Sequence, residues 1–388
     1  VKNMANNTST NIVMKWKELK DSTGVCPKPR HGHRCVGHGK YVIIIGGGNE
    51  GIIKEINVYN TANGKWFYPS SSYSQPPGCA AFGIVCHETN IIIFGGIYEQ
   101  GTYSNDIYKI SLLNWSWYLC PATFDEGIAP PCPRLGHSFT LSTNNEIYMF
   151  GGLSNDATNI PSVHPKYLND LYKLAVLEDG NLHWSIPITS GVPPSPRESH
   201  SALIHNYRDK KTLIIYGGMC GRRLGDIHFL EIESLLWVQP VILGPSPPPR
   251  SLHIAGIVQN KMVVFGGWIP ANDSVTSSDK TVFSENDWKC TNNVSSLNLE
   301  TLAWENVCIS ESDDLVPRPR AGHCGVMLNN RLYIWSGRDG FRKSWNDQVC
   351  CKDLWYLETS KALPPTRIMM DGNDTVSVSV KWDIISNG

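Results

Sequence analysis

Arginine recurs five times in one local setting, directly after a proline and three residues before a histidine. The arginines are Arg30, Arg134, Arg197, Arg250 and Arg320, and the histidines are His33, His137, His200, His253 and His323. A guanidinium presents a planar fork of N–H donors that matches a carboxylate. Five such groups on one surface would favour capture of an acidic ligand, so the arginines are candidates for a peptide-binding site.

A structural role competes with this interpretation. The same side chains could tie the starts of strands to neighbouring segments through hydrogen bonds to backbone carbonyls. That role is favoured for the histidines. For the arginines both roles stay open. A ring of like charges repels itself and has no evident structural need, which is the argument for binding of an acidic ligand.

An apolar run that ends in two glycines gives the sequence its period. The pairs are Gly46-Gly47, Gly95-Gly96, Gly151-Gly152, Gly217-Gly218 and Gly266-Gly267, and a sixth copy ends in Ser336-Gly337. Their first residues are 49, 56, 66, 49 and 70 positions apart. A unit of about 50 residues with insertions is the kelch period, and each kelch unit forms one four-stranded blade of a β-propeller.

Two further marks keep the same register. Polar residues begin a strand after the glycine pairs, at Asn105-Asp106-Ile107, Asn169-Asp170-Leu171, Gly225-Asp226-Ile227 and Lys352-Asp353-Leu354. A tryptophan follows in five repeats, at Trp66, Trp117, Trp184, Trp237 and Trp304. These tryptophans and the glycine pairs are expected to anchor blade to blade and to allow close packing of strands.

Two repeats depart from the pattern. The sixth lacks its tryptophan, but Trp16 lies 50 positions before Trp66. We therefore expect an N-terminal strand to complete the last blade, which would cover an edge that is otherwise exposed. In the second repeat, the segment Pro77–Ala81 replaces the Pro-Arg-x-x-His motif, so this blade has no arginine.

The marks predict an all-β fold, a six-bladed kelch β-propeller over residues 15–360, preceded by a disordered polar segment, 1–14. Because consecutive strands in a blade are antiparallel, the loop with the arginine and the loop after the glycine pair must lie on one face. The insertions 153–168 and 268–291 fall on that face as well. Arg222 and Arg338 lie in its loops and join the candidate peptide-binding residues.

Composition excludes several functions. A net charge of −1 without a basic cluster gives no reason to expect nucleic-acid binding. No stretch approaches the ~20 apolar residues of a membrane span, and the polar first 20 residues lack the apolar core of a signal peptide. The 12 cysteines are scattered and are expected to be reduced thiols, mostly buried. No metal-ligand spacing occurs, so neither a metal nor a cofactor is expected.

Several blocks between the marks are more specific than a kelch pattern. They include Gly46–Ile52, Tyr103–Asp106, Cys132–Phe139, Trp288–Asn292, Trp335–Lys343 and Gln348–Leu357. These blocks resemble the kelch domain of the host cell factors, and the resemblance covers residues 15–385. It implies a nuclear transcriptional coregulator, with the cytoplasm as a second location. It also implies a propeller that binds (Asp/Glu)-His-x-Tyr peptides of transcription factors and links them to chromatin-modifying complexes such as histone methyltransferases.

The segment 361–388 departs from the propeller pattern. Pro364–Arg367 and the alternating Val376, Val378, Val380 and Trp382 resemble the opening strands of a fibronectin type III domain. About 25 residues cannot build the ~100-residue sandwich of such a domain. We expect this incomplete segment to be disordered or to pair with strands from elsewhere.

Two other functional classes compete with the scaffold interpretation. Kelch proteins also serve as substrate receptors for ubiquitin ligases, usually through an N-terminal BTB domain, for which the short segment before the first strand leaves no room. Some kelch propellers are enzymes. We find no paired carboxylates in an acid–base motif and no nucleophile elbow, so a non-enzymatic protein is expected.

Overall fold

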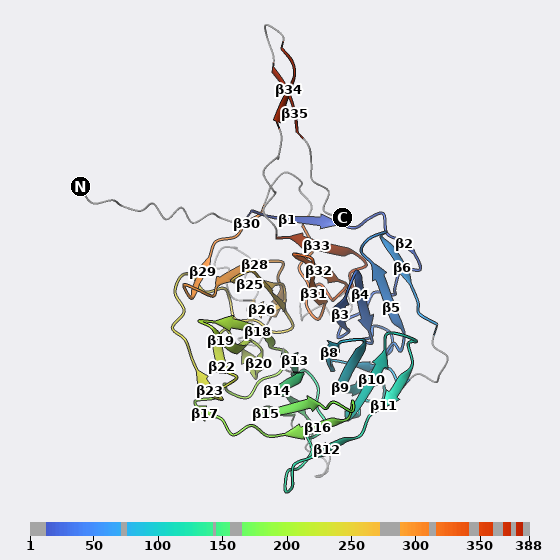
Figure 1. The fold of residues 1–388 in the computed structure, drawn as a ribbon, viewed down its shortest axis with the longest axis vertical. Coiled ribbons are helices and arrows are strands. Elements are labelled where there is room, and N and C mark those ends of the chain that lie inside the picture. Colours follow the sequence, from blue (N-terminus) through green and yellow to red (C-terminus); the bar gives the residue numbers. More distant parts are fainter. Residues whose placement is uncertain are drawn as a thin grey trace, which may run out of the picture.

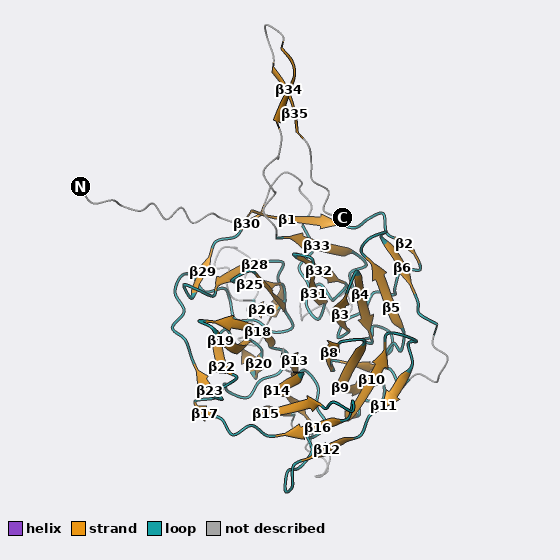
Figure 2. Cartoon of the chain, in the orientation of Figure 1, coloured by secondary structure: helices purple, strands orange, loops and turns teal. Residues whose placement is uncertain are grey.

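A computed structural model describes residues 13–70, 76–142, 145–155, 165–271, 288–309, 316–340, 349–359, 368–373 and 378–382. Within these ranges every regular element is a β-strand (Figure 2). None of the described residues belongs to a helix long and apolar enough to span a membrane.

Six antiparallel sheets are arranged around a central axis as the blades of a propeller (Figure 1). Blade 1 contains β3 (Arg34–His38), β4 (Tyr41–Ile45), β5 (Ile56–Asn60) and β6 (Lys65–Phe67). Blade 2 contains β8 (Gly83–His87), β9 (Asn90–Tyr98), β10 (Tyr103–Ser111) and β11 (Trp117–Leu119), with β7 (Cys79–Ala80) also on β9. Blade 3 contains β13 (Ser138–Leu141), β14 (Glu146–Ser154), β15 (Lys166–Val176) and β16 (Leu182–Ser185).

The second half of the ring repeats this order. Blade 4 contains β18 (Ser201–Tyr207), β19 (Lys210–Tyr216), β22 (Ile227–Glu231) and β23 (Leu236–Val238). Blade 5 contains β24 (Ile254–Val258), β25 (Lys261–Phe265), β28 (Val294–Asn298) and β29 (Ala303–Glu305). Blade 6 contains β31 (Cys324–Leu328), β32 (Arg331–Trp335), β33 (Leu354–Glu358) and β1 (Val13–Glu18). The predicted six-bladed kelch propeller is confirmed.

The N-terminal strand β1 completes the last blade, as predicted. It pairs antiparallel with β33, and Trp16 lies opposite Leu357. Short parallel strands extend the outer edges of four blades: β2 (Thr23–Gly24), β12 (Ala122–Phe124), β17 (Ser190–Gly191) and β30 (Cys308–Ile309). Each covers backbone groups that an edge strand would otherwise leave unpaired.

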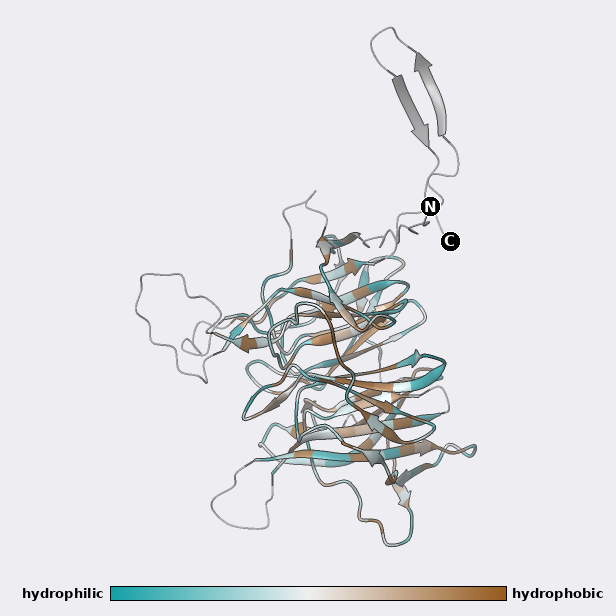
Figure 3. Ribbon diagram, turned by 90° about the vertical axis from the view of Figure 1, so that its left-hand side faces the viewer, coloured by the Kyte–Doolittle hydropathy of each residue, from teal (hydrophilic) through white to brown (hydrophobic). Residues whose placement is uncertain are grey.

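The hydrophobic core is divided among the six interfaces between adjacent blades. Each interface has its own cluster of buried side chains, and each cluster draws on two consecutive blades. In side view, apolar residues follow the stacked strands (Figure 3). The repeated tryptophan of each blade packs against the preceding blade, as Trp184 does against Phe94 with ring centroids 5.3 Å apart. The predicted anchoring role of the tryptophans is confirmed.

Two complete circles of backbone hydrogen bonds join the blades on the inner side. The N–H of the second glycine in each blade donates to the carbonyl of the residue that starts the next blade, usually the recurrent arginine, at 2.8–2.9 Å. The second circle, which we call the mouth ring, runs through Gly32, Ala81, Gly136, Ser199, Leu252 and Gly322, each of which donates to the preceding member at 2.7–3.0 Å.

The glycine pairs are needed for the first circle. Gly152, for example, has a φ of 109°, and a Cβ there would lie 2.8 Å from the carbonyl oxygen of Leu135. Both features exclude larger residues. At the one serine, Ser336 of blade 6, the hydroxyl accepts from the N–H of Arg30 and lies within donating distance of the carbonyl oxygens of Cys351 and Arg30, at 2.7 and 2.9 Å, so the side chain is accommodated by bonding.

Trp16→Ala is expected to lower the free energy of unfolding by about 3–5 kcal/mol, the usual loss for a buried tryptophan. Trp16 is 5% exposed and packs on Phe265 and Trp355. Trp117→Ala provides a matched control, because Trp117 holds the equivalent position in blade 2 and is only partly buried. Urea unfolding would measure both losses. Equal losses, or a loss at Trp16 under ~1 kcal/mol, would contradict an anchoring role for β1.

The two ends of the chain are described only in part. Residues 1–12 of the predicted disordered segment 1–14 are outside the described residues, whereas Val13 and Met14 belong to β1, so the ordered chain begins before residue 15. Residues 361–367, 374–377 and 383–388 of the predicted fibronectin-like segment are also outside the described residues. Within that segment, β34 (Ile368–Asn373) and β35 (Val378–Trp382) form a separate two-stranded antiparallel ribbon. The fibronectin-like assignment stays a prediction.

Candidate functional site

The loop with the arginine and the loop after the glycine pair lie on one face in five of the blades. Isolated β-bridges join the two loops directly: His31 to Gly48, Leu135 to Leu153, Glu198 to Met219, Ser251 to Trp268, and Ala321 to Arg338. We call this surface the Pro-Arg face. The topological argument from the sequence placed the two loops together correctly.

The five recurrent arginines are not on the surface of that face. Arg30, Arg134, Arg197, Arg250 and Arg320 are each 0% exposed. In every case Nη1 donates to the carbonyl of the first residue of its own blade's glycine pair, at 3.1–3.2 Å. Nε donates to the carbonyl two residues earlier. A docked peptide could not reach these guanidinium groups, so their prediction as peptide ligands was wrong.

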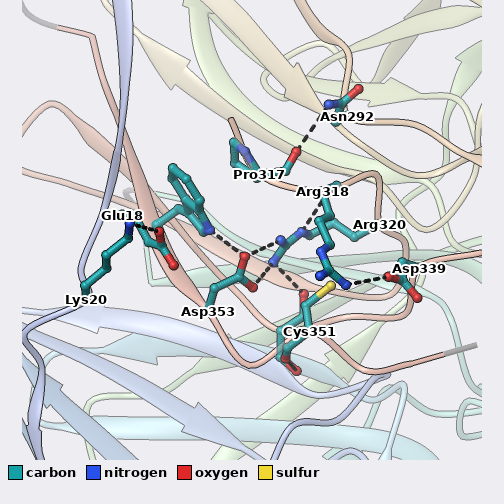
Figure 4. A network of polar contacts seen from close by, with 11 residues as sticks. Glu18, Lys20, Asn292, Pro317, Arg318, Arg320, Asp339, Cys351 and Asp353 are labelled. Atoms are coloured by element: carbon teal, nitrogen blue, oxygen red, sulfur yellow. Dashed lines mark hydrogen bonds and ion pairs between the residues drawn. The ribbon is translucent and has the colours of Figure 1, made fainter. Parts of the chain in front are cut away.

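Carboxylates within the same blades balance the buried charges. Nη1 and Nη2 of Arg134 donate to the two carboxylate oxygens of Asp170 at 2.6 and 2.8 Å. The same two nitrogens of Arg197 donate to the carboxylate oxygens of Asp226, both at 2.8 Å. Figure 4 shows the equivalent pair of Arg320 and Asp353, also at 2.8 Å. These aspartates belong to the polar strand starts noted in the sequence. In three blades two of the recurrent sequence marks therefore form one ion pair, in which the arginine is buried and the aspartate is 20–36% exposed, and the argument from charge repulsion does not hold for these arginines.

Blades 5 and 1 have weaker versions of this pair. Arg250 lies 3.5 Å from the side-chain oxygen of Asn293, and Arg30 lies 4.0 Å from Glu55. In blade 2, Cys79 takes the place of the arginine, and its Sγ lies 3.3 Å from the carbonyl oxygen of Gly95. The mouth ring aligns Ala81 with Gly32, and hence Cys79 with Arg30. The alignment of Pro77–Ala81 with the Pro-Arg-x-x-His motif, made from the sequence, was therefore one residue off.

The recurrent histidines also have structural roles. His33 Nε2 lies 3.1 Å from the carbonyl oxygen of Trp335, in the preceding blade. All five rings make edge contacts with the aromatic residue before that blade's glycine pair. Burial, aided by the nearby arginine, holds the pKa of each histidine well below its usual range. The rings are therefore neutral, and the structural interpretation favoured from the sequence is supported.

Arg222 and Arg338 are the two candidate arginines that keep accessible surface. Arg222 is exposed in a ribbon of β20 (Met219–Cys220) and β21 (Arg222–Arg223). Arg338 is half-buried, and its backbone bridges Ala321 and Cys350. Arg342 and Trp345, which the sequence also placed nearby, lie outside the described residues.

An aromatic and basic cluster stands beside these two arginines. β26 (Trp268–Pro270) pairs with β27 (Trp288–Cys290), and the rings of Trp268 and Trp288 stack with centroids 3.9 Å apart. The guanidinium of Arg223 lies 5.7 Å from the centre of the Trp268 ring. We call Arg223, Trp268 and Trp288 the Trp–Arg cluster. Flat aromatic surface beside cations is a common feature of peptide-binding sites.

One polar residue that sequence reasoning missed lies inside the ring. Arg34, the first residue of β3, lines a cavity of about 200 Å³ in the central channel. Its Nε donates to the carbonyl of Phe82 at 3.1 Å. Arg34 stands outside the recurrent motif, so no periodic signal could mark it.

The described residues include no group of three His, Cys, Asp or Glu side chains arranged to hold a metal ion. The eleven cysteines whose side chains the structure describes are all free thiols. Only four of them are buried, namely Cys290, Cys324, Cys350 and Cys351, so the expectation of mostly buried thiols was too strong.

Comparison with known proteins gives one consistent result. The family model described as "Host cell factor, Kelch-repeats domain" matches residues 13–358. Host cell factor 1 of Homo sapiens is 50% identical over 375 residues, which are 96% of this chain and 18% of the relative. Host cell factor 2 of Homo sapiens is 45% identical over 380 residues, 96% of this chain and 48% of the relative. The chain thus spans between about a fifth and a half of the length of these two relatives.

Proposed function

The chain belongs to the host cell factor family, and on this premise we propose that it is a non-enzymatic scaffold that binds short peptides of other proteins. Family membership confirms the resemblance seen in the sequence motifs. The peptides proposed are of the (Asp/Glu)-His-x-Tyr type, presented by transcription factors. The proposed setting is the nucleus, where the propeller would link such factors to chromatin-modifying complexes.

The observation that carries the proposal is the composition of the Pro-Arg face. With the five recurrent arginines buried, Arg222 and Arg338 are the candidate arginines left to attract an acidic peptide to this face. The Trp–Arg cluster lies beside them, and its half-buried Trp268, which stacks on the buried Trp288, is the ring proposed to contact the histidine or tyrosine of the peptide. Loops on a rigid scaffold are common positions for binding residues. The buried arginines support this site indirectly, because they fix the strand starts from which its loops emerge.

A labelled Glu-His-x-Tyr peptide is expected to bind saturably in a fluorescence anisotropy titration. A control peptide with alanine in place of histidine and tyrosine is expected not to bind. The double variant Arg222→Ser/Arg338→Ser should bind about three- to tenfold more weakly, because each exposed arginine contributes up to ~1 kcal/mol by attracting the acidic peptide to this face.

Arg208→Ser is the matched control for this experiment. Arg208 is also exposed, but it lies in the turn between β18 and β19, which is at the opposite end of the blade from the Pro-Arg face. Its replacement should leave peptide affinity unchanged. Equal binding of both peptides, or no binding by folded protein, would reject peptide recognition of this type. An equal loss in Arg208→Ser would move the site away from the Pro-Arg face.

A further inference from the structure

The central channel contains one cation among small and uncharged neighbours. The first strands of all six blades line the cavity there, and among the described lining residues Arg34 is the only lysine or arginine. These described lining residues include no aspartate or glutamate, although Glu198, next to Ser199 of the lining, attracts the charge of Arg34 from beyond ion-pair distance. The positions equivalent to Arg34 in the other blades, each directly after the recurrent histidine or its replacement Phe82, are Gly83, Ser138, Ser201, Ile254 and Cys324. The propeller therefore breaks its sixfold pattern here to place a guanidinium in the channel.

Arg34 keeps hydrogen-bond donors that the protein does not use. Nε donates to Phe82, and Nη1 lies at the long distance of 3.5 Å from the carbonyl oxygen of His33. Among the described residues, Nη2 has no hydrogen-bond acceptor and the guanidinium has no ion-pair partner. The recurrent arginines differ, since three of them are paired with aspartate. Arg34 is half-buried and has no carboxylate within ion-pair distance among the described residues, so an anion in the cavity would stabilise its charge.

The remaining groups around the cavity limit the charge of such an anion. His137, His200, His253 and His323 line it, and burial holds the pKa of each well below the usual range, so they are neutral. The guanidinium of Arg34 then carries the positive charge of the described lining, and an anion with a single negative charge would neutralise it. His200 is 8% exposed, and neither of its ring nitrogens has a hydrogen-bond partner among the described residues. Both of these ring nitrogens are themselves buried, so the guanidinium of Arg34 is the group of the lining that we assign to a ligand.

We propose that Arg34 binds a carboxylate in the central channel, and that this carboxylate is the acidic side chain of the peptide held on the Pro-Arg face. A guanidinium fork fits a monoanionic carboxylate, whereas a dianion would bring more charge than one arginine can balance. Ser199, Leu252 and Gly322 of the mouth ring also line the cavity, so it lies directly beneath this face. The identity of the occupant rests on the function proposed above, but the carboxylate site itself does not.

A double-mutant cycle tests the proposal. Glu-His-x-Tyr and Gln-His-x-Tyr peptides would be titrated against the wild-type protein, Arg34→Gln and the control Arg208→Ser. We expect the wild type and Arg208→Ser to prefer the Glu peptide by roughly ten- to hundredfold, as for loss of a charge-assisted hydrogen bond. Arg34→Gln should lose this preference while its affinity for the Gln peptide stays the same. A preference that persists in Arg34→Gln, or that is absent from the wild type, would overturn the assignment of the peptide carboxylate to Arg34.

A second measurement separates this proposal from the proposed function. The Nε–Hε resonance of Arg34 would be followed by NMR in wild-type protein during titration with propionate and, separately, with the Glu peptide. If neither peptide binds but propionate shifts this resonance saturably, peptide recognition fails and the channel site stands, with a free small carboxylate as occupant. If neither ligand shifts it, the site is overturned. Both titrations use wild-type protein, so they decide the matter even if Arg34→Gln does not fold.

Discussion

Replacing Arg197 with alanine is expected to lower the free energy of unfolding by about 3–5 kcal/mol, the loss typical of a broken buried ion pair. Arg197 is 0% exposed and bonds to the carbonyl of Gly217, to Asp226 and to Ser195. Its removal leaves Asp226 without its cation and the glycine carbonyl without its donor. Urea unfolding followed by tryptophan fluorescence would measure the loss, which is a large share of the ~5–15 kcal/mol that stabilises a typical domain.

Arg250→Ala is the matched control, because Arg250 holds the same position but faces an asparagine in place of an aspartate. Its removal strands no carboxylate, so the loss should be clearly smaller than at Arg197. Asp226→Asn should in turn reproduce much of the loss seen in Arg197→Ala. If Arg197→Ala kept full stability and instead weakened peptide binding, the structural role would be wrong and the binding role suggested by the sequence would be restored.

The sequence predicted the fold well because every mark of the repeat is local and recurs. The arginine motif, the glycine pair and the tryptophan keep one order within a blade, although insertions change the distances between them. Even the closing strand could be located, because Trp16 continues the series begun by Trp66. Periodicity thus specified the number of blades, their register and the face shared by the arginine loops and the loops after the glycine pairs.

The role of the arginines could not be predicted because their partners are distant in sequence. Arg134 and Asp170 are separated by 36 residues, and Arg197 and Asp226 by 29. Each residue was visible as a separate mark, but spacing alone does not show that two marks meet inside a blade. Without the aspartates, five arginines look like an uncompensated ring of charge and suggest a ligand. With them, three of these arginines form ion pairs that hold the first and third strands of a blade together.

Arg34 illustrates the opposite difficulty, since a residue that occurs in one blade only leaves no periodic signal. In the sequence it is a single arginine that directly follows His33. Its position in the channel depends on the closed ring of first strands, whose diameter and lining follow from all six blades together. Repeat patterns therefore identify the residues that build a propeller. The residues that distinguish one propeller from another are those that break the pattern, and periodicity does not reveal them.

Lowering the pH from 7 to 5.5 is expected to destabilise the propeller by roughly 6–7 kcal/mol, enough to unfold a domain of ordinary stability. Five recurrent histidines are buried and neutral, and burial lowers the pKa of His200, for example, to about 3. Unfolded histidines take up protons near pH 6.5, whereas the folded ones do not. The unfolded state therefore binds more protons in this window, so stability falls as the pH falls below about 6.5, by up to ~1.4 kcal/mol per histidine and pH unit.

The ion-paired aspartates separate this effect from ordinary acid unfolding. Burial opposes ionisation of Asp226 and Asp353, but hydrogen bonds and the paired arginines outweigh it and hold the pKa of each carboxyl below its usual range. Their stabilising contribution is complete above about pH 4 and is lost only below it. A fall in stability between pH 6.5 and 5.5 is therefore assigned to the histidines. His200→Gln, which removes one of the five protonation sites, should reduce the slope of unfolding free energy against pH by about a fifth in that window. A flat profile from pH 7 to 5.5 in urea unfolding would show that the ring tolerates charged histidines, and that the channel they line admits water or anions freely.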